Sequence, residues 1–91
     1  MQENDSQTYA YFYFMQDDPE GIGQRIAPSH AEYWKALQLA DYRGGPFKDF
    51  SGGMITFKAD NDTQAKEYVA GDPFVTHELL SNSWLKGWLV R

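Results

Sequence analysis

The segment Thr8–Met15 constrains the fold more than any other part of the sequence. It reads Thr-Tyr-Ala-Tyr-Phe-Tyr-Phe-Met, and aromatic residues in such a run favour a β-strand. Side chains alternate between the two faces of a strand, so its tyrosines point one way and its phenylalanines point the other. Because neither face is polar, we predict a central strand of a sheet that is covered on both sides.

A helix is predicted to begin at Pro28. The segment 16–27 before it is rich in turn residues and is expected to form a loop. Ser29 can cap the helix, and Glu32, three residues later, can complete a capping box. An apolar stripe of Tyr33, Trp34 and Leu37 carries the helix to about Leu39 or Ala40.

Two strands are predicted next. Residues 41–47 form a short, irregular strand or extended turn, and Gly44-Gly45-Pro46 is expected to interrupt regular pairing there. After a turn, Met54–Lys58 alternates as a strand of its own.

The last third of the sequence predicts two helices and a strand. Asn61 can cap the first helix, which ends at Gly71. Asp72 and Pro73 suit the cap and first position of a short helix that runs to about Leu80. Residues 83–90 alternate as the last strand.

With the short helix counted as a tail of the helix before it, this order is β-α-β-β-α-β, which predicts an α+β, ferredoxin-like fold with an antiparallel sheet and its helices on one face. We expect one domain over residues 1–91, with residues 1–7 as a loose lead-in. The second face of the sheet would meet water although it carries large apolar residues. A second copy of the chain is the simplest cover, giving a homodimer. The alternative is that the tyrosines tolerate partial exposure, with their hydroxyls in water.

Charge and composition exclude several classes of partner. The formal net charge is −5, so binding to a phosphate backbone is disfavoured and no nucleic-acid partner is expected. Cysteine is absent, which excludes disulfides and thiolate catalysis. No apolar run approaches the roughly 20 residues of a membrane span, and the acidic start is unlike a signal peptide. We therefore expect a cytoplasmic protein without membrane contact. No spacing of residues predicts a metal site.

His30 and Asp72 are the candidate chemical groups. In the first turn of a helix, His30 would be kept neutral by the helix dipole, which suits a base. The alternative is an ordinary surface histidine, which is how we interpret His77. Asp72 is either a helix cap or a carboxylate that orients an imidazole. Trp34, Trp84 and Trp88 belong to the core or a dimer interface, or they wall an aromatic pocket.

The sequence resembles the YCII-related domain family, within the dimeric α/β-barrel group of ferredoxin-like folds. The resemblance extends from about Tyr9 to Val90. It rests on Pro28-Ser29-His30, Gly45-Pro46, Gly53, Ala59-Asp60-Asn61 with Ala65, Gly71-Asp72-Pro73-Phe74-Val75, and a last strand that carries tryptophans.

The resemblance implies an active-site pair of His30 and Asp72. Better-understood relatives look like small lyases or isomerases, including dehydrochlorinases that act on chlorinated, hydroxylated aromatics. Family members often carry an arginine before the proline of the first helix, whereas this chain has Ala27 there and Arg25 two residues earlier. The predicted substrate contacts are Tyr11, Tyr13, Arg25, Gly45 and Pro46.

The predicted function is a small enzyme without cofactor or metal, in which a His-Asp pair transfers protons on a small aromatic or enolic substrate. Two alternatives stay open. One is a non-catalytic domain that binds a small ligand, and the other is a purely structural dimer module.

Overall fold

The computed structural model describes residues 6–91 of the chain. Its elements are β1 (Gln7–Met15), α1 (Ile22–Ala36), β2 (Arg43–Pro46), β3 (Gly52–Ala59), α2 (Asp62–Ala70), α3 (Pro73–Thr76) and β4 (Leu80–Gly87). Residues 1–5 of the predicted lead-in lie outside the described residues. Gln7, the last residue of that lead-in, already belongs to β1.

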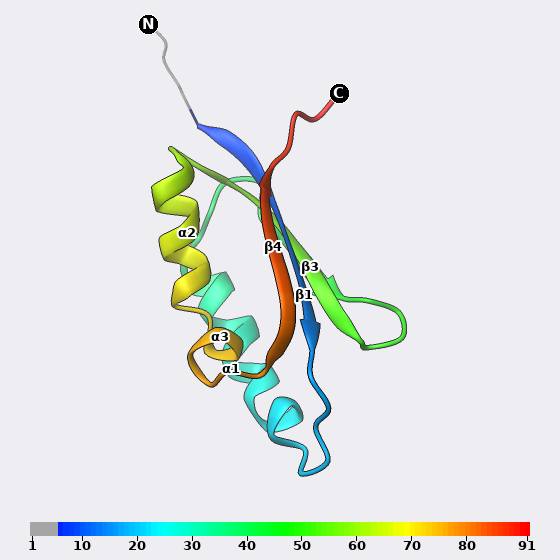
Figure 1. The fold of residues 1–91 in the computed structure, drawn as a ribbon. Coiled ribbons are helices and arrows are strands. Elements are labelled where there is room, and N and C mark those ends of the chain that lie inside the picture. The colour runs from blue at the N-terminus through cyan, green and yellow to red at the C-terminus, as the bar shows by residue number, and fades with distance from the viewer. Residues whose placement is uncertain (1–5) are drawn as a thin grey trace, which may run out of the picture.

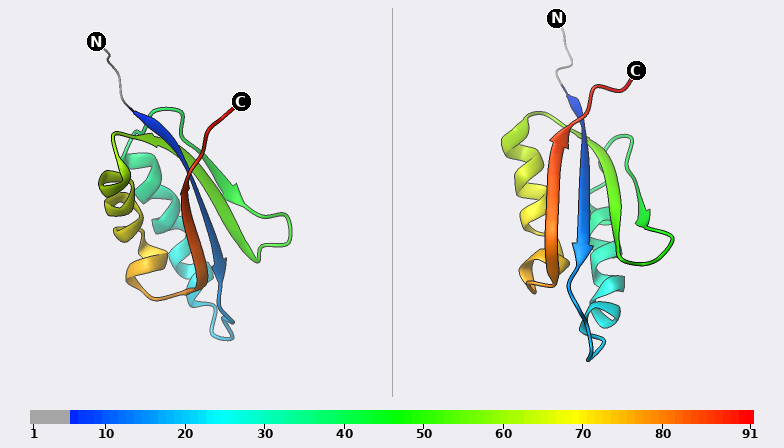
Figure 2. Two further views of the ribbon diagram at one scale, coloured as in Figure 1. Left: turned by 45° about the horizontal axis from the view of Figure 1, so that its top comes forward. Right: turned by 45° about the vertical axis from the view of Figure 1, so that its right-hand side comes forward.

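The strands form one four-stranded sheet in the order β2-β3-β1-β4, and each neighbouring pair is antiparallel. Figure 1 shows the three helices on the same side of this sheet. Both views in Figure 2 also show the helices on one side of the sheet, and in the right-hand view α1 lies behind β3 and α2 next to β4. The predicted α+β, ferredoxin-like fold is therefore confirmed, with β1 in the interior of the sheet.

The core lies between the sheet and the helices. Tyr9, Tyr11 and Tyr13 of β1 are buried on this side. Trp34 of α1 is fully buried, with its ring centroid 6.0 Å from that of Tyr11 and 5.4 Å from that of Phe57. A few large rings therefore fill most of the core of this small sheet.

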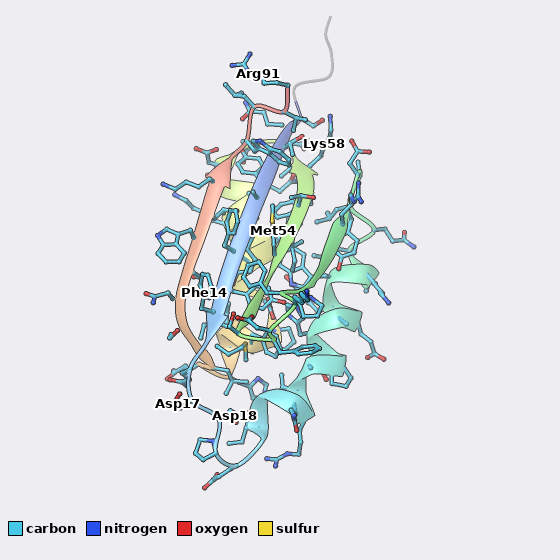
Figure 3. The ribbon with its side chains drawn as sticks, turned by 90° about the vertical axis from the view of Figure 1, so that its right-hand side faces the viewer. Phe14, Asp17, Asp18, Met54, Lys58 and Arg91 are labelled. Atoms are coloured by element: carbon cyan, nitrogen blue, oxygen red, sulfur yellow. The ribbon has the colours of Figure 1, made fainter. Side chains whose placement is uncertain are left out.

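The opposite face of the sheet is not covered by any described helix. Figure 3 looks onto this face, where Phe14, Met54 and Lys58 lie on β1 and β3. Phe12 stands opposite both Met54 and Trp84 in the register, and 48% of Trp84 is exposed. Strand β1 was predicted to be covered on both faces. Within one chain, the helices cover only the face that carries its tyrosines.

Helix α1 begins earlier than the sequence predicted. It starts at Ile22, Pro28 lies inside it, and Ser29 does not cap it. The first amides are instead satisfied by Asp18, whose carboxylate accepts from Ile22 N at 2.7 Å and from Gly23 N at 2.8 Å. Gly21 precedes the helix at φ 72°, a conformation that favours glycine. The prediction was wrong because Pro28 and the possible capping box of Ser29 and Glu32 were interpreted as a helix start, whereas these residues lie inside the helix.

Strand bounds also differ from the predicted ones. Gly44, Gly45 and Pro46 were expected to interrupt pairing, yet all three pair with β3. This is possible because β2 is an edge strand, where a proline needs no partner for its missing N–H. The last strand begins at Leu80 instead of residue 83, and α3 ends at Thr76.

The predicted caps of the two later helices are confirmed. The Asn61 side chain accepts from Gln64 N at 2.8 Å, and the Asp72 side chain accepts from Phe74 N at 2.8 Å. Such caps depend on residues close in the sequence, which makes them predictable.

Candidate functional site

His30 and Asp72 form a buried pair between α1 and α3. His30 Nδ1 lies 2.8 Å from Asp72 Oδ1, although the two residues are 42 positions apart. Asp72 has no exposed surface, and 9% of His30 is exposed. An isolated carboxylate would be costly to bury, so its partners decide whether this arrangement is stable.

Asp72 accepts hydrogen bonds on both oxygens. The N–H of Trp34 Nε1 donates to Oδ2 at 2.9 Å, and Phe74 N donates to Oδ1 at 2.8 Å, beside His30. His30 and Trp34 are four residues apart on α1, so they lie on one helix face and reach the same carboxylate. Asp72 is therefore a helix cap and a hydrogen-bond partner of His30 at once. Its predicted catalytic role stays a prediction.

The second nitrogen of His30 faces Tyr13. His30 Nε2 lies 3.2 Å from the Tyr13 hydroxyl. Because a carboxylate only accepts, we assign a ring proton to Nδ1, and in the neutral imidazole Nε2 then accepts from the Tyr13 O–H. His30 lies in the middle of α1, so this pair of contacts, and not the start of a helix, determines its tautomer.

Aromatic rings hold the imidazole in place. The Phe74 ring stacks on it with centroids 4.1 Å apart and an interplanar angle of 17°. The Tyr13 ring meets it edge-on at 5.2 Å and lies 5.7 Å from the Phe74 ring. The imidazole is thus fixed by two hydrogen bonds and two ring contacts.

The tyrosines near the pair are held neutral. Burial raises the pKa of Tyr13 to about 12, and the charge of Asp72 adds to the rise. Burial and Asp72 also raise the pKa of Tyr11, while a contact with Ser83 opposes the rise. That contact does not meet the usual geometric limits of a hydrogen bond. The buried Tyr11 hydroxyl therefore has no hydrogen-bond partner among the described residues.

A cavity of about 1080 Å³ opens beside the pair. It lies between α1, the loop that precedes it, β2 and the hairpin before β3. Wall residues include Tyr13, His30, Lys35, Tyr42, Gly45, Pro46 and Phe74. A more open hollow of about 690 Å³ is lined by Phe14, Phe47 and Lys48 among others, and none of its polar side chains is buried. The larger cavity is the candidate site because, of these two, it alone is lined by a buried histidine, His30, which is hydrogen-bonded to a carboxylate.

The structure brings five of the seven predicted site residues together. His30, Tyr13, Gly45 and Pro46 line the cavity, and Asp72 supports His30 from behind. The other two do not reach the cavity wall. Tyr11 lies in the core under Trp34, and the Arg25 side chain donates to the Glu20 carbonyl oxygen at 3.3 Å.

Sequence reasoning missed the supporting roles of Trp34 and Phe74. The predicted helix already contained both His30 and Trp34, and their spacing of four residues could have indicated that they share one helix face and one partner. No pattern in the sequence indicates that Phe74 stacks on His30, since this contact depends on how α3 packs against α1.

Residues 6–91 contain neither a candidate metal site nor a candidate membrane-spanning helix. No group of three or more His, Cys, Asp or Glu residues within 6–91 is arranged to hold a metal ion. In the same range no helix is long and apolar enough to cross a membrane.

Comparison with known proteins supports the fold. No protein-family model matches the chain, and no curated protein matches it significantly in sequence. Among solved structures, it is similar to the 5-chloro-2-hydroxyhydroquinone dehydrochlorinase of Burkholderia phenoliruptrix AC1100, in complex with 2,5-dihydroxybenzoquinone. The TM-score is 0.76 at 18% identity, with 90% of this chain and 93% of that chain covered.

Two further structures have the same fold. A dimeric ferredoxin-like protein of unknown function from Thermobifida fusca matches with a TM-score of 0.58 at 10% identity, covering 93% of this chain and 91% of that one. SnoaB, a cofactor-independent oxygenase from Streptomyces nogalater, matches with a TM-score of 0.53 at 13% identity, covering 97% and 95%. The chain therefore has the ferredoxin-like fold of these proteins, in which small enzymes occur.

Proposed function

We propose that this protein is a small enzyme that transfers protons on a hydroxylated aromatic or enolic substrate, with the pair of His30 and Asp72 as its acid–base centre and without a cofactor. The observation that carries the proposal is the contact of 2.8 Å between His30 Nδ1 and Asp72 Oδ1 beside a cavity of about 1080 Å³.

The pair has the chemical properties of an acid–base catalyst. Asp72 holds the tautomer in which Nε2 can accept a proton, and its charge balances the imidazolium that results. The hydrogen bonds from Trp34 and Phe74 keep the carboxylate ready for this role without further reorganisation.

The wall of the cavity favours a flat, polar ring as substrate. Phe74 and Tyr42 offer aromatic surface, and Lys35 is the one lysine or arginine of the wall among the described residues. Lys35, rather than the predicted Arg25, is therefore the cation available for an ionised hydroxyl group. Similarity in fold to the dehydrochlorinase supports a chlorinated polyhydroxybenzene as one substrate class.

Dehydrochlorination of such a ring needs only proton transfers and the loss of chloride. For a chlorinated trihydroxybenzene, two hydroxyl protons leave, one proton is added at the carbon that carries chlorine, and chloride departs with the electrons of the carbon–chlorine bond. The product is a hydroxyquinone, and no external oxidant is consumed. This chemistry agrees with membership of the YCII-related family. We also propose that residues 1–91 form a single domain of that family. The cytoplasmic location stays a prediction.

The test is chloride release from 5-chloro-2-hydroxyhydroquinone, with chlorinated phenols and lactones as a wider panel. We expect turnover by the wild type and by the matched control His77→Gln, because His77 is exposed and does not line the cavity. Turnover by His30→Gln should fall by about 10²-fold or more. A wild type inactive on the whole panel, or an active His30→Gln, would count against the proposal.

The second candidate function is binding of a small aromatic ligand without catalysis. It is favoured by one observation, that both nitrogens of His30 are already hydrogen-bonded within the protein. Saturable binding of 2,5-dihydroxybenzoquinone without turnover of any related substrate would support this candidate.

We also infer a homodimer formed through the open face of the sheet. Phe12, Phe14 and Trp84 lie there partly exposed, and the Thermobifida fusca protein of the same fold is described as dimeric. Light scattering at micromolar concentration should give about twice the chain mass of 10.5 kDa. A purely structural dimer module would form this dimer and bind none of the tested molecules.

A further inference from the structure

Within the protein, His30 has no nitrogen left for a ligand. Nδ1 contacts Asp72 at 2.8 Å, and Nε2 contacts the Tyr13 hydroxyl at 3.2 Å. Phe74 covers one face of the ring at a centroid distance of 4.1 Å. A ligand in the cavity can therefore hydrogen-bond to the imidazole only at Nε2, where the Tyr13 hydroxyl now lies.

We propose that the Tyr13 hydroxyl, and not His30 itself, is the group that exchanges a proton with the occupant of the cavity, and that His30 acts through it. This inference rests on the proposed function for its catalytic part. Tyr13 lines the same cavity as His30, so its oxygen can contact the ligand and Nε2 at once.

The step conserves protons and electrons. The Tyr13 oxygen accepts a proton from a hydroxyl group of the substrate while its own proton moves to His30 Nε2. One O–H bond breaks in the substrate, one O–H bond is exchanged at Tyr13 and one N–H bond forms at His30. The result is a substrate anion and an imidazolium balanced by Asp72, and the reverse transfer returns the proton.

Tyr13 acts in this step as a relay and not as a free base. Burial raises its pKa to about 12, so a separate tyrosinate is scarcely populated at neutral pH. Transfer to and from the oxygen must therefore be concerted, which the hydrogen bond to Nε2 allows.

The backbone of β3 fixes the position of this hydroxyl. Gly53 pairs directly with Tyr13, and a Cβ added at Gly53 would collide with the Tyr13 hydroxyl. Glycine at this position therefore leaves the space in which the phenol reaches His30. Gly53 is a positioning residue, and Gly53→Ala should displace the Tyr13 hydroxyl although the variant still contains every proposed chemical group.

The test compares Tyr13→Phe with Tyr9→Phe in the full chain. Tyr9 is a matched control on the same face of β1: its hydroxyl donates to Asp62 at 2.7 Å, and this bond together with burial raises its pKa to about 12. The ¹⁵N resonances of His30 are measured with and without 2,5-dihydroxybenzoquinone, and kcat and KM are measured with the chlorinated hydroquinone.

Removing the Tyr13 hydroxyl should change the Nε2 resonance of free His30, whereas Tyr9→Phe should not. The quinone should shift Nε2 in the wild type and in Tyr9→Phe, and lose this effect in Tyr13→Phe. The kcat of Tyr13→Phe should fall about 10²-fold with KM little changed, and that of Gly53→Ala should fall in the same direction.

The outcomes separate this inference from the proposed function. If the quinone shifts Nε2 equally in Tyr13→Phe, or if kcat is unchanged there, ligands reach His30 directly and the inference is overturned while the enzyme proposal stands. If the wild type shows no turnover but the Nε2 response still requires Tyr13, the enzyme proposal fails and the contact through Tyr13 stands. A wild-type His30 that does not respond to millimolar quinone overturns the inference as well.

Discussion

Replacement of Asp72 by asparagine tests the structure of the site most directly. As a helix cap alone, asparagine serves about as well as aspartate, so the stability should hardly change. In the structure, however, Asp72 accepts from three N–H groups on two oxygens and has no exposed surface. Asparagine offers one accepting oxygen, so at least one of these donors must lose its partner.

The size of the effect follows from which donor is lost. With its oxygen kept toward His30 and Phe74, the new amide group faces the N–H of Trp34, donor against donor. A buried donor left without a partner costs about 1–3 kcal/mol. In the flipped orientation, the amide nitrogen would face the N–H groups of His30 and Phe74, and both would lose their acceptor. The first orientation, which leaves one donor without an acceptor, should therefore be favoured. We therefore expect Asp72→Asn to lower the free energy of unfolding by about 1–3 kcal/mol.

The assay is urea unfolding at neutral pH and fixed protein concentration, because dimerisation would link stability to concentration. The matched control is Asn61→Asp, the reverse exchange at the exposed cap of α2, which should stay within about 0.5 kcal/mol of the wild type. A double-mutant cycle with Trp34→Phe sharpens the test. Once the Trp34 donor is gone, Asp72→Asn should cost clearly less. An Asp72→Asn protein as stable as the wild type, or a cost that Trp34→Phe leaves unchanged, would refute the reasoning.

Four further outcomes are expected. His30→Ala should lower the free energy of unfolding by about 3–5 kcal/mol in urea titrations, because it leaves a buried carboxylate without its main partner; a stable variant would show that the pair is not needed for folding. Asp18→Ala should cost about 0.5–2 kcal/mol by the same assay, since Asp18 caps α1. Tyr13 has a folded-state pKa of about 12 against an ordinary value near 10, so the stability it contributes is complete below pH 10 and is lost as the pH rises through 12. The urea midpoint should therefore fall steeply over this range, and less steeply in Tyr13→Phe. Trp84→Lys should reduce the mass seen by light scattering toward that of one chain, and a variant with an unchanged mass would place the interface elsewhere.

Local signals explain which parts of the fold were predictable. The caps at Asn61 and Asp72 each depend on residues no more than three positions away, and both were predicted correctly. The start of α1 was not, because Asp18 caps it from four and five positions before the amides that it binds, and Pro28 suggested a later start. Pairing of β2 was missed for a different reason: only the order of the sheet shows that Pro46 lies at an edge.

The sequence by itself determined the order of the elements, the central aromatic strand and the identity of the pair, the last through resemblance. The tertiary structure decided which side chains act on that pair. Tyr11 and Tyr13 lie two residues apart on the same strand face, and no local rule distinguishes them. Packing does: Trp34 covers Tyr11 and closes it into the core, whereas His30, one helical turn earlier, meets Tyr13 beside the cavity. The pattern of a strand determines which face a residue occupies, but the neighbour across that face depends on where a distant helix lies along the sheet.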